Sequence, residues 1–415
     1  MSIVKELAAK AKVASRELAL LTAKDKNQAL LSVADMILAN TTEIIKSNEI
    51  DLKNGADSGL SPALLDRLAL NKDRIMDMVE GVKQVTELED PVGEVIASWD
   101  RPNGLIINKV RVPMGVVGMV YEARPNVTVD TCALCLKAGS AVVLRGSSSA
   151  LNSNRALVKA IKKGLENSTI PVNAVQFIDT GDRDAVEEML RLNGLLDLVI
   201  PRGGANLIRT VVQKATVPVI ETGVGNCHVY IDKDADPAMA GEIIINAKCQ
   251  RYGVCNAAET LLVHQELAAS WLPEAIRELQ ARGVEIRGCS QTLSLVPDIA
   301  PANEEDWSTE FLAPILSVKI VDNTHAAISH IQTYGSGHSE SIVTANDAVA
   351  EEFLKNIDAA AVYHNASTRF TDGFQYGFGA EIGISTQKLH ARGPMGLVEL
   401  TSYKYVVRGS GQTRS

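Results

Sequence analysis

The sequence predicts an α/β protein with two parallel-sheet domains and a small additional β element. Two regions alternate short apolar runs, typical of buried strands, with longer amphipathic segments, and this alternation favours parallel sheets with right-handed crossovers. Before the first of them, two β-rich runs within residues 94–112 flank the turn Arg101-Pro102-Asn103-Gly104, which is typical of a hairpin. Residues 1–90 instead place apolar side chains at three- and four-residue steps and predict helices.

The order of elements follows from the same patterns. In the first α/β block we expect strands over 116–120, 141–144, 175–178, 196–200 and 217–220, with helices over 128–138, 153–165 and 184–192. In the second block we expect strands over 257–263, 315–321 and 341–344, with helices over 266–281, 325–331 and 347–357. A glycine-rich stretch over 373–396 then leads to a final β-like run over 403–407. Many nucleotide-binding proteins share such an architecture, which does not by itself fix a function.

Composition narrows the class of protein. The chain has 415 residues, 46% of them hydrophobic and 22% charged, so two or three soluble domains are expected. A net charge of −9 argues against general electrostatic binding to nucleic acid or anionic lipid, and leaves a small phosphorylated ligand possible. Charged residues interrupt any signal core near the N-terminus, no long apolar run predicts a membrane span, and six cysteines suit a reducing compartment. We expect a cytoplasmic protein.

The cysteines differ in their surroundings. Cys132 and Cys135 form a C-x-x-C within an apolar helix, without a second pair at metal-binding spacing, which indicates core packing rather than a metal site. Cys249 and Cys289 have no evident partner, and Cys227 with His228 begins a strand, so burial is expected for them.

Cys255 lies in the polar segment 250–258, just before an apolar strand. The neighbouring Arg251 would favour a thiolate, the nucleophilic form of cysteine. On spacing alone, a buried small hydrophobic residue is an equally good interpretation.

Several motifs, taken in order, resemble the aldehyde dehydrogenase superfamily: residues 113–126, Glu221-Thr-Gly-Val-Gly225, Cys255 and residues 310–318. Glu221 and Cys255 are 34 positions apart, a separation similar to that of the general base and nucleophile in that superfamily. Residues 321–342, 379–396 and 400–405 resemble more narrowly the glutamate-5-semialdehyde dehydrogenase (γ-glutamyl phosphate reductase) family. The resemblance extends from the N-terminal helices to the last strand.

That resemblance implies an NADP-dependent, phosphorylating oxidoreductase in the second step of proline biosynthesis from glutamate. It would reduce L-glutamate 5-phosphate to L-glutamate 5-semialdehyde with NADPH and release phosphate. Cys255 would displace phosphate to form a thioester, which hydride reduces to a thiohemiacetal. The Asn126 amide and the Cys255 backbone N–H would form the oxyanion hole; from the residues alone, Asn126 is equally a turn residue after Pro125.

Glu221 occupies the position of the superfamily's general base, where hydrolytic members activate water. A reductase that uses phosphate has no need of that water, which would hydrolyse the thioester. Glu221 is therefore a candidate for proton handling or for a structural role.

Cofactor residues are indicated by weaker signals, since no G-x-G-x-x-G follows the first strand. The resemblance places Arg145 where the superfamily holds the adenosine ribose, and Gly146, Ser147 and Ser148 of the following loop are expected to bind the cofactor with it. No acid occurs within 146–150, and acids select the unphosphorylated ribose, so NADP is favoured over NAD. The family more often has an acid near the end of this loop, and Ser149 departs from that pattern.

Two further cofactor contacts are expected. Gly203 and Gly204 open a helix and could cradle a phosphate at its positive end, although an ordinary strand-to-helix turn explains them as well. Glu310 aligns with the glutamate that binds the nicotinamide ribose, and its alternative is a solvated carboxylate.

For the substrate, Arg251, Ser336 and His338 are candidate contacts. The run Gly335-Ser-Gly-His-Ser339 is typical of a mobile polar loop that could hold the amino-acid or phosphate end of a ligand. His330 is more simply a structural histidine, and the oxygen ligands and helical spacing of a metal site are missing.

The resemblance also implies a division of the chain. Residues 1–94, 114–226 and 365–397 would form the cofactor-binding domain and 227–364 the catalytic domain. Residues 95–113 and 398–415 would form an oligomerisation hairpin and C-terminal strand, which implies a homo-oligomer. Transient contact with glutamate 5-kinase, the source of the acyl phosphate, is a further expectation.

Two alternatives remain at this point. A hydrolytic or CoA-acylating aldehyde dehydrogenase would share most of these motifs, and a requirement for phosphate separates it from the reductase. A non-catalytic scaffold with the same fold would be expected to lack Cys255 or Asn126, and both are present.

Overall fold

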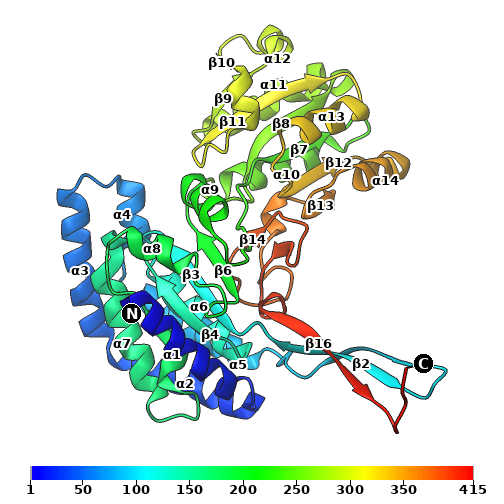
Figure 1. The fold of residues 1–415 in the computed structure, drawn as a ribbon. Coiled ribbons are helices and arrows are strands. Elements are labelled where there is room, and N and C mark those ends of the chain that lie inside the picture. The colour runs from blue at the N-terminus through cyan, green and yellow to red at the C-terminus, as the bar shows by residue number, and fades with distance from the viewer. Residues whose placement is uncertain (1, 415) are drawn as a thin grey trace. The chain divides into compact units, whose positions relative to one another are not determined.

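The computed structural model describes residues 2–414 and divides the chain into two compact units. The first unit contains residues up to 222, residues 377–383 and residues from 395 onward; the second contains 223–376 and 384–394. The two units are described separately (Figure 1).

The first unit begins with five helices, as the apolar periodicity predicts: α1 (Ile3–Leu18), α2 (Ala23–Ala39), α3 (Thr41–Asp57), α4 (Pro62–Leu68) and α5 (Lys72–Glu87). Side chains cap the starts of α1, α2, α4 and α5, and Thr22 and Asp25 form a reciprocal capping box at α2. Four parallel strands follow in the order β5-β4-β3-β6: β3 (Val116–Tyr121), β4 (Ala141–Arg145), β5 (Val175–Phe177) and β6 (Leu198–Arg202).

Helices connect and cover these strands: α6 (Asn126–Lys137), α7 (Leu151–Leu165), α8 (Asp184–Met189) and α9 (Ala205–Lys214), with 3-10 turns η1 (Ser148–Ala150), η2 (Val172–Ala174) and η5 (Val398–Leu400). The strands β3 and β4 are completely buried, because helices shield a parallel sheet on both faces. Cys132 and Cys135 lie in α6 and are buried in the hydrophobic core, so their predicted packing role is confirmed.

The small β element is a three-stranded antiparallel sheet in the order β1-β2-β16, formed by β1 (Val95–Asp100), β2 (Ile106–Pro113) and β16 (Thr401–Arg408) (Figure 1). The predicted hairpin is confirmed, and the C-terminal strand pairs with β2 over its whole length, from Thr401 opposite Pro113 to Arg408 opposite Ile106.

The second unit contains a seven-stranded parallel sheet in the order β10-β9-β11-β8-β7-β12-β13. Its strands are β7 (Cys227–Ile231), β8 (Ala258–His264), β9 (Glu285–Gly288), β10 (Ala300–Pro301), β11 (Ile315–Val321), β12 (Ser339–Val343) and β13 (Ala361–His364). Its helices are α10 (Pro237–Cys249), α11 (Gln265–Ala281), α12 (Ser290–Leu295), α13 (Thr324–Tyr334) and α14 (Asp347–Asn356), with η3 (Glu304–Ser308) and η4 (Thr368–Phe370). A short pair, β14 (Ile384–Ser385) and β15 (Gly393–Pro394), completes it.

The predicted fold class is thus confirmed, but one predicted strand is wrong, and several elements, among them α10, β9 and β13, were not predicted. Residues 217–220 do not form a strand but make a single bridge, between Val199 and Val219. Pro218 has no N–H to donate to a ladder, and only its carbonyl is bonded, by the Val199 N–H at 2.8 Å. Within residues 2–414, no helix is both long and apolar enough to cross a membrane.

Candidate active site

In the second unit, the predicted catalytic and substrate residues gather at one end of the sheet. Cys255 precedes β8, Gly225 precedes β7, His338 precedes β12 and Glu310 precedes β11. These four strands are neighbours in the order β11-β8-β7-β12 and all run parallel, so the segments before them meet at the same, amino-terminal edge. The sheet therefore brings together residues that are more than a hundred positions apart in the sequence.

Cys255 lies half-buried in the loop that joins α10 to β8. Its backbone is enclosed on one side by Gly225, where a Cβ atom would lie 1.5 Å from the Cys255 carbonyl oxygen. The buried Cys227 thiol lies 3.1 Å from that same oxygen. The next residue, Asn256, donates through Nδ2 to the carbonyl of Thr371 at 2.9 Å and receives Thr368 Oγ1 on its own carbonyl at 2.8 Å.

Arg369 is a neighbour of Cys255 that the sequence did not reveal. Its guanidinium donates to the Asn256 side-chain oxygen and to Gln250 Oε1, the latter at 2.9 Å. Burial lowers the pKa of Arg369, Arg251 lowers it further, and the opposing influences include Cys255. A cation in this position favours the thiolate form of a cysteine. No local motif surrounds Arg369, so only the fold could place it there.

The other predicted residues of this unit have defined partners. Glu310 is half-buried, and its Oε1 accepts the Gly225 N–H at 2.8 Å. Ser336 Oγ accepts the Asn226 N–H at 3.0 Å. Arg251, four positions before Cys255 in the sequence, is exposed.

His338 is completely buried, with Nδ1 at 2.7 Å from Ser339 Oγ, although its polar surroundings in the sequence indicated a mobile loop. Ser339 Oγ continues to Thr371 Oγ1 at 2.6 Å, so His338 Nδ1 takes part in a buried chain of hydrogen-bonded groups. His330 is also buried, as a structural role requires, and burial lowers its pKa to about 2.

A buried ion pair supports the segment that carries Glu310. Lys248 Nζ and Glu259 Oε2 are 2.5 Å apart, and both side chains are 0% exposed. The other Glu259 oxygen accepts the Leu312 N–H at 3.1 Å, where Leu312 has a left-handed backbone with φ of 51°. Burial raises the pKa of Glu259 to about 7, against the influence of Lys248, and burial lowers the pKa of Lys248. These directions reflect the cost of removing both charges from water.

In the first unit, the predicted cofactor residues gather at the carboxyl-terminal edge of the sheet. Arg145 ends β4 and is followed by Gly146, Ser147 and Ser148, while Gly203 and Gly204 follow β6. Both strands pair with β3 in parallel, so their carboxyl ends lie at the same edge of the sheet, on either side of β3. In open parallel sheets this edge is the usual place for a ligand.

Arg145 is tied to its own surroundings. Its guanidinium donates to the carbonyls of Gly146, Gly181 and Asp182 at 2.9, 3.1 and 2.9 Å, while its Nε is buried without a hydrogen-bond partner. Gly146 is required by packing, because a Cβ there would lie 2.1 Å from Asn154 Nδ2. Ser148 is exposed and Ser147 is half-buried, so the loop presents hydroxyl groups at this edge.

The start of α9 is occupied by a side chain of the same unit. Gly204 donates its N–H to Glu122 Oε2 at 2.8 Å, and a Cβ on Gly203 would lie 2.6 Å from the Glu122 carboxyl carbon. A carboxylate at this end of a helix shows that the position accepts an anion.

Asn126 is the first residue of α6, after β3, and its side chain is exposed. Its Nδ2 donates to Asp130 Oδ2 at 3.0 Å, one helical turn away. Burial raises the pKa of Asp130 to about 6, and the hydrogen bond from Asn126 opposes that shift. Glu221 is half-buried and lies next to Thr222, whose Oγ1 donates to the Pro201 carbonyl at 2.9 Å.

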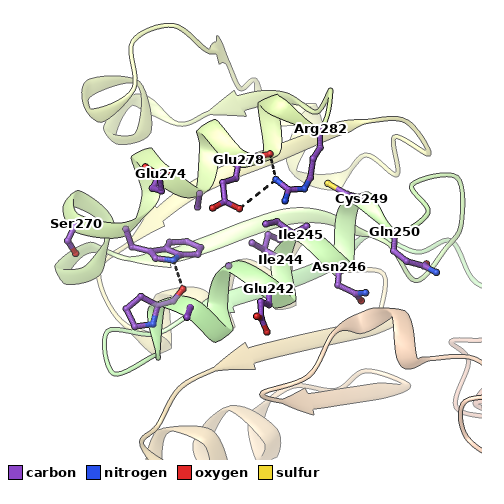
Figure 2. Close-up of a pocket in the computed structure, with 15 residues that line it drawn as sticks. Glu242, Ile244, Ile245, Asn246, Cys249, Gln250, Ser270, Glu274, Glu278 and Arg282 are labelled. Atoms are coloured by element: carbon purple, nitrogen blue, oxygen red, sulfur yellow. Dashed lines mark hydrogen bonds and ion pairs between the residues drawn. The ribbon is translucent and has the colours of Figure 1, made fainter.

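A separate hollow of about 1030 Å³ lies between α10 and α11 (Figure 2). Glu242, Glu274 and Glu278 lie around it, and Arg282 pairs with Glu278 at 3.6 Å. Cys255 does not line it, although Gln250 of the same loop does.

The chain matches the aldehyde dehydrogenase family over residues 2–287 and 295–406. It is 70% identical to the γ-glutamyl phosphate reductase of Desulforamulus reducens over 414 residues, covering 100% of both chains. It is 59% identical over 414 residues to the γ-glutamyl phosphate reductase of Carboxydothermus hydrogenoformans, again covering 100% of both. A crystal structure of γ-glutamyl phosphate reductase from Thermotoga maritima superposes with a TM-score of 0.98 at 52% identity, covering 100% of both chains.

The chain therefore belongs to the aldehyde dehydrogenase family, a family of oxidoreductases that use NAD(P). The narrower resemblance drawn from residues 321–342, 379–396 and 400–405 is confirmed as well, because these full-length relatives are named γ-glutamyl phosphate reductases.

Proposed function

We propose that the protein reduces L-glutamate 5-phosphate to L-glutamate 5-semialdehyde with NADPH and releases phosphate, as the second step of proline biosynthesis in the cytoplasm. The observation that carries the proposal is the position of Cys255, half-buried on a braced loop with the Arg369 guanidinium close by. The full-length relatives named for this reaction supply the substrate class.

The proposed chemistry uses Cys255 as the nucleophile. Its thiolate attacks the γ-carbonyl carbon, the C–O bond to phosphate breaks, and a thioester forms. Bound NADPH would supply a hydride to the thioester carbon, and collapse of the thiohemiacetal on Cys255 would release the aldehyde and restore the thiolate. Negative charge develops on the carbonyl oxygen in both steps, so we propose that the Asn126 amide and the Cys255 backbone N–H donate to it.

The residues of the first unit fit an NADP molecule. A Cβ on Gly146 would lie 2.1 Å from Asn154 Nδ2, Gly204 presents an N–H at a helix start that already accepts a carboxylate, and residues 146–150 contain no acid. We propose that Arg145, Gly146, Ser147, Ser148, Gly203 and Gly204 surround the adenosine and phosphate groups. We propose that Glu310 binds the nicotinamide ribose, with a ribose hydroxyl donating to the same carboxylate whose Oε1 accepts the Gly225 N–H.

The remaining residues are proposed for a general role, without a specific contact. Arg251, Ser336 and His338 are candidate contacts for the substrate, and because His338 is completely buried, it would contact a substrate only after its loop moves. Glu221 is a candidate for proton handling. We also propose a homo-oligomer formed through the sheet β1-β2-β16, whose Trp99, Tyr403, Tyr405 and Val407 are exposed. Contact with glutamate 5-kinase is proposed as transient.

The cofactor proposal is tested by placing an acid in the loop that follows β4. We expect Ser148→Asp to raise the KM for NADP⁺ by about tenfold, because a carboxylate there repels the 2′-phosphate and favours the unphosphorylated ribose of NAD⁺. Ser148 is exposed, so the fold accepts an aspartate at this position. The KM values for NADP⁺ and NAD⁺ are measured in the reverse direction, with glutamate semialdehyde and phosphate.

Ser148→Asn is the matched control, because asparagine has the size of aspartate without its charge. It is expected to keep the preference of the wild type. If aspartate and asparagine change the KM for NADP⁺ equally, the 2′-phosphate does not lie near this loop.

A further inference from the structure

The segment Gly225–His228 is held by hydrogen bonds to two neighbouring segments, 307–310 and 334–340. The Gly225 N–H donates to Glu310 Oε1 at 2.8 Å, and the Asn226 N–H donates to Ser336 Oγ at 3.0 Å. Asn226 is buried, and its Nδ2 donates to the carbonyls of Trp307 and Tyr334, both at 2.8 Å. The position of this segment is therefore fixed by the loops that carry the predicted cofactor and substrate contacts.

His228 fixes the other end of the segment. Its backbone N–H and its Nδ1 both lie within hydrogen-bonding distance of Glu340 Oε2, at 2.8 and 2.9 Å, and both side chains are completely buried. Burial raises the pKa of Glu340, which His228 opposes. Two bonds to one carboxylate oxygen leave the start of β7 little freedom to shift.

Two groups of the segment Gly225–His228 contact the Cys255 peptide directly. Gly225 packs backbone against backbone, since a Cβ there would lie 1.5 Å from the Cys255 oxygen and 2.3 Å from its carbonyl carbon. The Cys227 thiol lies 3.1 Å from the same oxygen. The contact with Gly225 is close packing, whereas the contact with the Cys227 thiol is a directional hydrogen bond.

The Cys227 thiol is a donor at neutral pH. It is 0% exposed, and burial, assisted by Glu340 and Cys255, raises its pKa well above the usual value, so it keeps its proton. A second polar neighbour, His338 Nδ1, lies farther away at 3.7 Å. The Cys255 carbonyl is thus the nearer acceptor.

We propose that Cys227 is a positioning residue, whose thiol donates to the Cys255 carbonyl oxygen and holds the nucleophile in its reactive orientation. This inference rests on the proposed role of Cys255 as the nucleophile. On the following residue, the bonds from Thr368 to the Asn256 carbonyl and from Asn256 to Thr371 fix the next peptide. Cys227 supplies the corresponding restraint on the Cys255 peptide itself.

The test compares Cys227→Ala with Cys227→Ser. Alanine removes the donor, so we expect kcat to fall about tenfold while the KM for NADP⁺ changes by less than about twofold, because misorientation acts on the reacting group. The rate of Cys255 alkylation by iodoacetamide at neutral pH, followed by peptide mass spectrometry, should fall about threefold as Cys255 shifts relative to Arg369. Serine retains a donor and should restore kcat to within about threefold of the wild type.

Cys135→Ala is the matched control, because Cys135 is another completely buried cysteine, in the first unit, and undergoes the same truncation. Its kcat and alkylation rate should equal those of the wild type, and melting curves show that each variant is folded. An unchanged kcat in Cys227→Ala, or a serine variant as impaired as the alanine variant, would contradict the proposal. Cys255→Ala, assayed in parallel, separates the two hypotheses: turnover without Cys255 would remove the proposed function itself.

Discussion

Replacing Cys255 with alanine is expected to lower turnover by about 10⁴-fold or more, because no thioester can form without the thiol. Folding and NADP⁺ binding should be nearly unchanged. The side chain is only half-buried, and the bonds from Cys227 to the Cys255 carbonyl and from Asn256 to Thr371, which brace this loop, remain possible in the variant. Steady-state kinetics, a melting curve and a titration with NADP⁺ measure the three quantities.

Cys289→Ala is the control for this substitution. Cys289 is a half-buried cysteine of the same unit, at the start of α12, where its thiol lies 3.3 Å from Thr292 Oγ1. We expect its turnover to match that of the wild type. Wild-type turnover in Cys255→Ala would remove covalent catalysis by this residue from the mechanism.

Replacing Lys248 with methionine is expected to destabilise the protein by about 3–5 kcal/mol, because Glu259 is left as a buried charge without its partner. Lys248 and Glu259 are both completely buried, and the Leu312 N–H is the remaining donor to the carboxylate. Burial already raises the pKa of Glu259, and removal of Lys248 raises it further. The folded state then binds a proton more tightly than the unfolded state, so stability is retained at acidic pH and lost as the pH rises.

Chemical unfolding measures this effect, at acidic and at alkaline pH. The double variant Lys248→Met with Glu259→Met should recover most of the stability, because a buried ion pair can be replaced by apolar side chains of similar volume. Lys214→Met breaks the exposed pair with Glu187 and should cost less than about 1 kcal/mol. If Lys248→Met costs no more than Lys214→Met, the buried pair does not stabilise the second unit.

Periodicity and turn chemistry were sufficient to predict most of the fold. The hairpin around Arg101–Gly104 and the parallel strands predicted at 116–120, 141–144, 257–263 and 315–321 follow from local patterns and are confirmed, whereas β9 and β13 were not predicted. The strand predicted at 217–220 was wrong because its apolar residues outweighed the missing N–H of Pro218. Local patterns predict which residues are buried better than they predict which backbone groups form hydrogen bonds.

The site was predictable only where its residues lie in motifs. Cys255, Asn126 and Glu310 were found through motifs, and their chemical roles remain proposals. Arg369 and the contact of Cys227 with Cys255 depend on the order of strands in the sheet, which places distant segments together. His338 looked like part of a mobile loop because sequence reveals polarity but not whether neighbouring polar groups, such as Ser339, satisfy it in the interior.

The most direct test of the central claim is reduction of NADP⁺ by glutamate semialdehyde, measured with and without inorganic phosphate. In this direction the thioester on Cys255 can be released only when phosphate attacks it. We therefore predict steady formation of NADPH with phosphate, and without it no more than the single turnover that forms the thioester. Sustained formation of NADPH without phosphate would contradict the account, and would indicate a hydrolytic dehydrogenase in which Glu221 activates water.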